Sequence, residues 1–303
     1  FVFYFEKRVK RTIREYEMVK KGERIGVALS GGKDSLATLY LMNEVCKSMR
    51  AKLIAISVDE GIAGYRGALL KNARALCRKL KVKHEVFSFK KEIGKSMDEV
   101  AKIERRGGIG RSLKLRGAEP PAVRREAACT YCGVFRRWIL NKAARELKLD
   151  KLATGHNLDD VAQTTLMNVM RNEPFRLARF GASGGIIESK EFVPRVKPLF
   201  RIPEKEVAQY AILTGLPVKF SECPYASEAF RGRVRKFVNE IEEEYPGTKF
   251  KIMRSFLVLK KGLASIYKKG ELGELKKCER CFEPSSAKLC KCCELKEGMK
   301  KKN

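Results

Sequence analysis

The fold of this chain follows from one segment, Ile25-Gly26-Val27-Ala28-Leu29-Ser30-Gly31-Gly32-Lys33-Asp34-Ser35. Its apolar part predicts a buried strand over 25–30, and the residues after it predict a helix over 35–48. Glycines between a strand and a helix let backbone N–H groups approach an anion, because they lack a Cβ and the helix start carries partial positive charge. Lys33 and Ser35 would add a charge-assisted contact and a hydroxyl contact. We therefore predict that Ser30, Gly31, Gly32, Lys33, Asp34 and Ser35 bind the pyrophosphate part of a nucleotide.

The spacing of this loop narrows the chemistry. The motif G-x-x-x-x-G-K-S/T, which serves γ-phosphate transfer, does not fit the segment. The loop resembles instead that of the N-type ATP pyrophosphatases, which split ATP to AMP and pyrophosphate and activate a substrate oxygen as its adenylate. An ordinary glycine turn capped by Ser30 is the alternative. Turn chemistry alone explains neither Lys33 nor the position of the loop between strand and helix.

Strands and helices alternate around the loop. Alternation of this kind predicts an α/β fold with a parallel sheet and helices on both faces. Residues 104–128 are rich in Gly and Arg and predict a loop, whereas 201–260 is mostly helical in pattern. The expected strands are 25–30, 53–58, 85–87 and 151–154, and the expected helices are 6–20, 35–48, 65–80, 133–146 and 158–169.

Composition divides the chain into four parts. A basic helix or linker over 1–20 precedes an ATP pyrophosphatase-like domain over 21–222. A helical region over 223–272 and a small C-terminal zinc knuckle over 273–303 follow. The chain begins with Phe1 and an aromatic run instead of methionine, so we expect that the native N-terminus is missing.

Composition also restricts the partners and the compartment. The 303 residues include 65 Lys+Arg and 36 Asp+Glu, a net charge of +29, and 44% hydrophobic residues, enough for a sizeable core. So large a positive excess favours a polyanion, and above all a nucleic acid, over a merely solvated surface. No stretch reaches the roughly 18 apolar residues of a membrane span. The ten cysteines, several spaced C-x-x-C, predict metal ligands in a reducing compartment, so we expect a cytoplasmic protein without a membrane partner.

Two further segments follow predicted strands, where ligands of open parallel sheets bind. In Ser57–Ile62, backbone groups around Val58 could hold an adenine edge, and Asp59 could meet a ribose or a metal. In Thr154–Asp160, Gly155 permits close approach, and Asp160 or Asp34 would hold Mg²⁺ through oxygen ligands. The alternatives are that Asp159 and Asp160 cap the helix, and that the two histidines, His84 and His156, are structural.

The cysteines fall into two sets. Cys129 and Cys132 precede a helix and the basic pair Arg136-Arg137, and Cys223 stands alone before Pro224. The arginines and the helix start predict lowered thiol pKa values. Three such cysteines can bind a metal or an iron–sulfur cluster with one coordination position open, which suits chemistry; three inert buried thiols are the alternative.

The second set is spaced as a closed site. Two C-x-x-C pairs lie close together near the end of the chain, and four thiolates at this spacing predict a tetrahedral structural zinc knuckle. Cys292 is left over. The predicted zinc ligands are Cys278, Cys281, Cys290 and Cys293.

Taken together, these motifs resemble the tRNA 2-thiolation enzymes of archaea and the eukaryotic cytoplasm. The likeness rests on the loop, on Asp59-Glu60-Gly61-Ile62 with Gly64-Tyr65-Arg66, on Cys129 to Arg137, and on Thr154 to Asp160. The second and third of these motifs are most similar to the wobble-uridine branch. The resemblance implies a [4Fe-4S] cluster on Cys129, Cys132 and Cys223, and ATP contacts at Ala28, Ser30, Lys33, Asp34, Ser35, Val58, Arg136, Gly155 and Asp160. Relatives carry a second, N-terminal zinc knuckle that is not seen here.

The resemblance also implies a reaction. The C2 oxygen of a flipped uridine 34 attacks the α-phosphate of ATP, with the charge met by Lys33, Arg136 and Mg²⁺. Sulfur then replaces the adenylated oxygen, delivered by hydrosulfide on the open iron or by a persulfide on Cys132 or Cys223. Implied partners are tRNA and a ubiquitin-like sulfur carrier or sulfide; a homodimer is one assembly considered. The alternatives are the same chemistry at uridine 54, an ATP-dependent amide-forming synthetase, and a non-catalytic zinc-ribbon RNA-binding protein.

Overall fold

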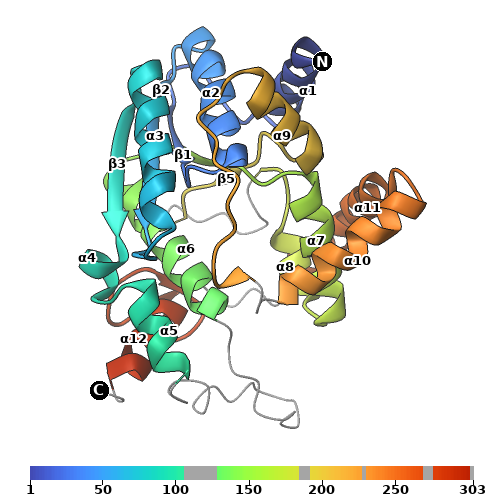
Figure 1. Cartoon of the computed structure of the whole chain (residues 1–303). Coiled ribbons are helices and arrows are strands. Elements are labelled where there is room, and N and C mark those ends of the chain that lie inside the picture. Colours follow the sequence, from blue (N-terminus) through green and yellow to red (C-terminus); the bar gives the residue numbers. More distant parts are fainter. Residues whose placement is uncertain (106–127, 184–191, 227–229, 269–275, 301–303) are drawn as a thin grey trace.

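A five-stranded parallel sheet lies at the centre of the protein, as a computed structural model of the chain shows (Figure 1). The structure describes residues 1–105, 128–183, 192–226, 230–268 and 276–300. The strand order is β3-β2-β1-β4-β5, so the chain moves outward on one side of β1 and then returns to its other side. The strands are β1 (Arg24–Ala28), β2 (Lys52–Asp59), β3 (Lys83–Ser88), β4 (Lys151–Thr154) and β5 (Arg195–Val196).

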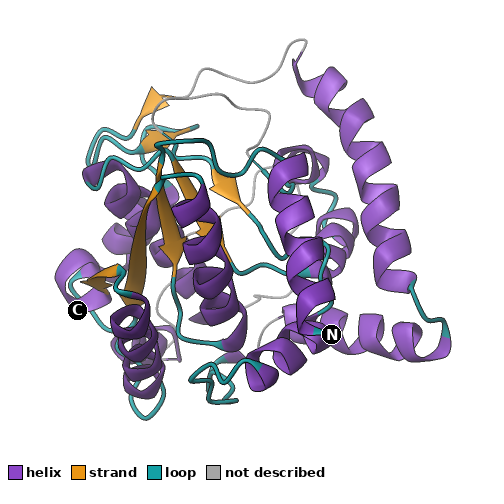
Figure 2. Cartoon of the chain, turned by 90° about the horizontal axis from the view of Figure 1, so that it is seen from above, coloured by secondary structure: helices purple, strands orange, loops and turns teal. Residues whose placement is uncertain are grey.

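Alternating side chains give the sheet two buried faces. In β2, Ala55 packs into the core beneath α2 (Lys33–Ser48), whereas Ile54 and Ile56 pack with residues of α6 (Ala128–Glu146) on the opposite face. Figure 2 shows helices on both sides of the strands. The predicted parallel α/β sheet is therefore confirmed. Because β1 lies between β2 and β4, the reversal of strand order falls at the carboxyl end of β1, where such folds bind ligands.

The helices between the strands match the predicted alternation, with shifted ends. α2 begins at Lys33 instead of residue 35, because its polar first turn has no apolar periodicity to reveal it. α6 begins at Ala128 instead of residue 133, which places two cysteines in its first turns. The helices of the N-terminal half are α1 (Val2–Glu15), α2, α3 (Arg66–Leu80), α4 (Phe89–Ile93), α5 (Met97–Arg105) and α6.

Residues 104–128 were expected to form a loop. Glu104 and Arg105 instead end α5, and Ala128 starts α6. Residues 106–127 lie outside the described part of the chain. The N-terminal helix is also earlier than expected, since it ends at Glu15 and not at residue 20.

The predicted helical region after residue 201 is confirmed. α10 and α11 pack on α7, and α11 also contacts α8, so these four helices form one side of the molecule (Figure 1). The helices are α7 (Leu158–Met170), α8 (Pro174–Arg179), α9 (Glu204–Leu213), α10 (Phe230–Glu244) and α11 (Thr248–Lys268).

The cysteine-rich C-terminal segment packs against α6. It consists of β6 (Lys276–Lys277), β7 (Pro284–Ser285) and α12 (Lys291–Lys300). Glu283 accepts a hydrogen bond from Asn141 Nδ2 at 2.8 Å and pairs with Arg145. Buried residues of this C-terminal segment, such as Leu295, share a hydrophobic core with Phe135 of α6. Among the described helices, none is long and apolar enough to cross a membrane.

Candidate active site at the carboxyl edge of the sheet

The loop after β1 is held open by its own hydrogen bonds. Gly31 has a φ of +87°, and a Cβ there would clash with the backbone of Leu69. Ser35 Oγ accepts from the Gly31 N–H at 3.0 Å and donates to the Gly32 carbonyl at 2.9 Å. Ser30 Oγ accepts from the Gly32 N–H at 3.3 Å, so Ser30 does support the turn, whereas α2 itself begins after Gly32 without a side-chain cap. The first N–H groups of α2 therefore have no side-chain cap competing for them, as an anion site requires.

Lys33 lies among carboxylates beside this loop. Its Nζ is 3.0 Å from Asp34 Oδ2 and 2.7 Å from Glu204 Oε1. Burial opposes its charge, but the two carboxylates outweigh burial and raise the pKa of Lys33. Burial likewise raises the pKa of Asp34, despite the neighbouring ammonium. Glu204, at the start of α9, was not found from sequence because no motif surrounds it.

The segment after β4 joins Asp34 to Asp160. Asn157 caps α7: its side chain accepts from the Asp160 N–H at 3.1 Å, and its Nδ2 donates to Asp34 Oδ1 at 2.9 Å. Asp160 completes the capping box and is 3.3 Å from Arg231. Burial raises the pKa of Asp160. Three desolvated carboxylates, Asp34, Asp160 and Glu204, therefore influence one another here, which suits a bound cation.

Gly155, His156 and Asp159 have different surroundings. A Cβ at Gly155 would lie 2.8 Å from the backbone C of Asp34, so the close approach is to the loop itself. Asp159 does not cap α7; it accepts from the Glu204 N–H at 2.7 Å and pairs with Lys249. His156 Nδ1 is bonded to Thr154 Oγ1 at 2.8 Å, and desolvation, followed by the charges of Lys197 and Arg231, lowers the pKa of His156. His84 is bonded to Ser57 Oγ at 2.7 Å, consistent with a structural role.

The segment after β2 is anchored by a buried ion pair that the sequence did not reveal. Glu60 lies 2.8 Å from Arg66 and 3.6 Å from Arg136. Arg66 in turn donates to the backbone carbonyl of Ser30. Asp59 Oδ1 accepts from the Gly61 N–H at 3.0 Å, and thus shapes its own turn. Glu60 and Arg66 are six residues apart in one motif, but their pairing depends on the turn between them, and the contact with Arg136 joins distant parts of the sequence.

Cys129, Cys132 and Cys223 meet at one place. Cys129 and Cys132 lie one turn apart on α6, and Cys129 Sγ donates to the Tyr225 carbonyl at 3.0 Å, next to Cys223. The charges of Cys129 and Cys223 both act on Cys132. The predicted lowering of thiol pKa is wrong for Cys132, because burial beside Tyr131 and Phe135 raises its pKa to about 11 and outweighs Arg136. Arg136 remains accessible, with 47% of its side chain exposed.

The segment carrying Cys223 is fastened by Asp98 of α5. Its Oδ1 accepts from the Tyr225 hydroxyl at 2.6 Å and its Oδ2 accepts from the Ala63 N–H at 2.9 Å. Asp98 therefore holds together the turn after β2 and the Cys223-Pro224-Tyr225 segment. A hollow of about 310 Å³ lies beside Asp98, and the residues that line it include Ile62 and Tyr225.

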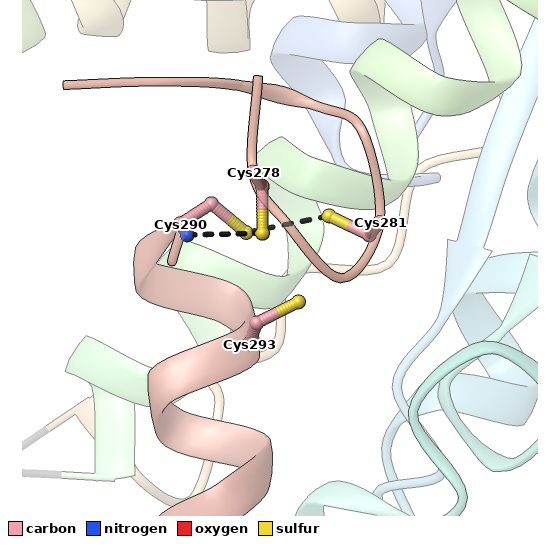
Figure 3. A group of neighbouring side chains, drawn as sticks. All are labelled: Cys278, Cys281, Cys290 and Cys293. Carbon is pink, nitrogen blue, oxygen red and sulfur yellow. Dashed lines mark hydrogen bonds between the residues drawn. The ribbon is translucent and has the colours of Figure 1, made fainter. Parts of the chain in front are cut away.

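The four C-terminal cysteines form a tight group. Their Sγ atoms all lie within 4.8 Å of one another, and Figure 3 shows the four side chains pointing toward a common centre. The Cys290 N–H donates to Cys278 Sγ at 3.2 Å. Burial opposes a thiolate at Cys278, but backbone N–H donors from Cys290, Arg280 and Cys281 lower its pKa to about 6. The group can hold one metal ion, and Cys292 is confirmed as lying outside it.

Similarity to known proteins agrees with this geometry. Residues 4–117 match the family model of the PP-loop domain, the class that the fold and loop define. The chain is 38% identical to the tRNA 2-thiolation protein NcsA of Haloferax volcanii, over 97% of this chain and 90% of that protein. It is 35% identical to the tRNA-5-methyluridine(54) 2-sulfurtransferase of Pyrococcus horikoshii, over 98% of this chain and 86% of that one. The chain belongs to the family of tRNA 2-thiolation proteins, as its motifs predicted.

Two further similarities bear on compartment and cofactor. The cytoplasmic tRNA 2-thiolation protein 1 of Candida glabrata is 35% identical, over 99% of this chain and 80% of that protein. The structure is similar to that of the U34-tRNA thiolase NcsA from Methanococcus maripaludis with its [4Fe-4S] cluster. That match has a TM-score of 0.73 and 34% identity, and covers 97% of this chain and 87% of the other.

Proposed function

We propose that this protein is a tRNA sulfurtransferase that adenylates C2 of wobble uridine 34 with ATP and replaces the oxygen with sulfur. A [4Fe-4S] cluster bound by Cys129, Cys132 and Cys223 would serve the sulfur step. The proposal rests on the PP-loop fold, on the arrangement of the site, and on relatives named for tRNA 2-thiolation.

A continuous chain of contacts between the nucleotide loop and the cysteines carries the proposal. Arg66 bonds to the Ser30 carbonyl of the loop and pairs with Glu60. Glu60 also pairs with Arg136, whose charge acts on Cys132 one helical turn away. A uridine between these two groups of residues could therefore be adenylated and receive sulfur without leaving the site. An ATP-dependent amide-forming synthetase would have no use for the cysteines.

The nucleotide site uses backbone and charge. The uncapped N–H groups at the start of α2 would hold phosphate oxygens, and Lys33 would exchange its carboxylate partners for phosphate. Asp34, Asp160 and Glu204 would hold Mg²⁺ together with phosphate oxygens, since a desolvated carboxylate gains most from a cation. The remaining proposed ATP contacts are Ala28, Ser30, Ser35, Val58, Asp59, Arg136 and Gly155.

The two cysteine groups fit two different metals. Cys129, Cys132 and Cys223 are not among the sets close enough for one ion in the described chain, but a cluster spreads its thiolates over different irons. With three protein ligands, such a cluster supplies an open iron that can carry a sulfur ligand. The four C-terminal thiols fit tetrahedral zinc.

The residues of the chain have defined tasks in the reaction. The uridine C2 oxygen attacks the α-phosphorus, the bond to the β-phosphate breaks, and pyrophosphate leaves. Lys33 and Arg136 would stabilise the negative charge that develops at the α-phosphate. A sulfur nucleophile then adds at C2 and AMP leaves with the former O2. The sulfur comes from a hydrosulfide or from the outer sulfur of a persulfide on Cys132 or Cys223. In the second case the other cysteine attacks the S–S bond, the thiouridine is released, and the resulting disulfide is reduced by an external thiol.

Position 54 is the second candidate. It is favoured by the relative from Pyrococcus horikoshii, whose name specifies uridine 54 and whose identity of 35% is similar to that of the others. Position 34 is supported by the solved NcsA structure, which is named a U34-tRNA thiolase, and by the Asp59-Glu60-Gly61-Ile62 and Phe135-Arg136-Arg137 motifs. Mapping 2-thiouridine in tRNA from cells that lack this protein separates the two positions.

Partners and organisation follow from the same proposal. The substrate is tRNA, and the sulfur donor is a ubiquitin-like carrier or sulfide; a homodimer is part of the proposal. A cytoplasmic location is supported by the name of the relative from Candida glabrata and by ten free cysteines. We retain the four-part division at residues 20, 222 and 272, with 223–272 as the tRNA-binding region.

One experiment tests the proposed chemistry. Anaerobically prepared protein with ATP, tRNA and sulfide should form AMP, pyrophosphate and 2-thiouridine in equal amounts. Lys33→Ala should lower all three rates by about a hundredfold or more, because it removes a charge that stabilises the transition state. Lys52→Ala is the matched control, because Lys52 lies at the amino end of β2, away from the site. Release of ADP and phosphate instead of AMP and pyrophosphate would refute the proposal.

A further inference from the structure

Four positively charged side chains form a row between α6 and α11. They are Arg137 of α6, Arg195 of β5, Lys197 directly after β5, and Lys260 of α11. We call them the cation row. None belongs to the nucleotide loop or to either cysteine group, and the candidate site described above does not use them.

Hydrogen bonds and packing hold the row in place. Arg195 Nη2 donates to the backbone carbonyl of Arg137 at 3.2 Å. Lys197 Nζ donates to the carbonyl of Gly181 and lies 5.0 Å from the centre of the Phe180 ring. Lys260 Nζ lies against Gly181, where a Cβ would clash with it. Two ammonium groups thus converge on one glycine.

Among the residues that the structure describes, no carboxylate pairs with the row. In the described part of the chain, none of its four members forms an ion pair with Asp or Glu. Other partly buried lysines differ: Lys33 pairs with Glu204, Lys151 with Glu23, and Lys249 with Asp159. The missing compensation is therefore local to the row.

The charges of the row destabilise one another. Desolvation and the Arg137 charge lower the pKa of Arg195 to about 10. Desolvation, followed by the charges of Arg195 and Lys260, lowers the pKa of Lys197 to about 7. No carboxylate of the described residues is among the causes of either pKa shift. A bound anion would relieve both the desolvation and the repulsion.

The position of the row connects it with the candidate site. Arg136 lies one helical turn from Cys132, and its charge helps to lower the pKa of Arg137. The charges of Lys197 and Arg195 both help to lower the pKa of His156, which follows β4. The row therefore extends from α11 to the edge of the site where the uridine would lie. The four cations lie on three separate elements of the protein. This spread matches successive phosphates of a nucleic-acid strand better than the adjacent phosphates of one ATP molecule, for which the loop after β1 is the proposed site.

We propose that Arg137, Arg195, Lys197 and Lys260 bind backbone phosphates of the tRNA strand that carries the target uridine. This inference rests on the proposed function. The row supplies register: phosphate contacts fix how far the strand advances, and the base then reaches the space between Arg136 and the nucleotide loop. Phosphate from ATP is the other source of the same chemistry, and the test separates the two.

The test compares single charge removals. For Arg195→Gln, Lys197→Gln and Lys260→Gln, unmodified tRNA transcript should bind about tenfold more weakly, and the slope of log affinity against log salt should fall by about one. The KM for ATP should stay unchanged. Lys197→Arg should restore the affinity for tRNA. Lys52→Gln changes a lysine at the amino end of β2, and it should weaken tRNA binding by less than about twofold.

Each result decides the inference. A raised KM for ATP with unchanged tRNA affinity would assign the row to the nucleotide and overturn the proposal. Equal losses in Lys52→Gln would also overturn it, because they would indicate general attraction by the net charge. The wild-type thiolation assay separates this inference from the proposed function: if wild type forms 2-thiouridine while Lys197→Gln keeps full tRNA affinity, only the inference fails.

Discussion

The two cysteine groups of this protein differ in what their surroundings leave unsatisfied. At the C-terminus, four thiols point toward one centre, and backbone N–H groups already stabilise a thiolate at Cys278. At the carboxyl edge of the sheet, three thiols come from two segments, and burial raises the pKa of the Cys132 thiol. The four-thiol group can surround one metal ion completely. The three-thiol group leaves one coordination position of its proposed cluster open.

The same difference extends to the charges. Around the C-terminal group, Glu283 is bonded to both Asn141 and Arg145, so the module is fixed to α6. At the edge of the sheet, burial raises the pKa of Asp34 and Asp160 despite their partners Lys33 and Arg231, and the cation row has no carboxylate partner among the described residues. Unbalanced groups cost stability, and they are retained where a ligand restores the balance. Four predictions test this contrast.

The largest effect is expected for Cys223→Ala. Loss of one of three cluster ligands should abolish thiolation and remove iron, while zinc stays bound, because the four-thiol group shares no ligand with it. Iron and zinc are measured by elemental analysis of anaerobic protein. Cys77→Ala, which removes a buried thiol from α3, should keep both metals. Iron retained in Cys223→Ala would contradict the assignment.

Cys290→Ala should have the opposite result. We expect loss of zinc and a melting temperature lower by about 6–12 °C, corresponding to about 3 kcal/mol, since a structural metal contributes directly to folding. Iron should be retained. Cys292→Ala, a buried neighbour outside the group, should keep zinc, and loss of zinc from that variant would show that the ligand set is wrong.

Tyr225→Phe should loosen the open group without removing a ligand. It deletes the hydroxyl that donates to Asp98 at 2.6 Å, a bond worth about 1.5 kcal/mol when the acceptor is charged. The lifetime of the cluster in air should fall about tenfold, as followed by its visible absorption. Tyr245→Phe, an exposed tyrosine, is the control. An unchanged lifetime would mean that Asp98 does not position Cys223.

The smallest effect is a pH dependence of tRNA affinity. Lys197 is neutral above its pKa of about 7, so phosphate binding there must take up a proton. Affinity should therefore fall about fivefold from pH 7 to pH 8. The charged or titratable groups facing Lys197 are Arg195, Lys260 of α11 and His156, and His156 stays neutral in this range. Lys197→Arg should remove the dependence, and a dependence that persists in that variant would assign it elsewhere.

Prediction from sequence succeeded where the information was contiguous. The loop from Ser30 to Ser35 revealed its strand, its turn and the presence of the helix that follows, because each is set by neighbouring residues. The spacing of Cys278 to Cys293 predicted one four-thiol group for the same reason. The ends of α2 and α6 were misplaced, since their first turns carry polar or small residues and show no apolar period.

The pKa of Cys132 shows where such reasoning stops. Sequence revealed the nearby arginines but not the aromatic core beneath the thiol. Electrostatic attraction and desolvation oppose each other, and their balance depends on how deeply the side chain is buried. That depth is fixed by Tyr131 and Phe135 packing with residues of α4 and α5, which only the folded chain brings together.

By itself the sequence determined the α/β class, the nucleotide loop, both cysteine groups and the family, because short-range patterns encode local backbone geometry and ligand spacing. Only the tertiary structure decided that Glu204 pairs with Lys33, that Glu60 joins Arg66 to Arg136, and that α6, β5 and α11 contribute to one cation row. These contacts join residues as far as 171 positions apart. No local sequence pattern specifies such pairs. The order of the parallel strands around β1 specifies them, because it brings the carboxyl ends of the strands to one edge of the sheet.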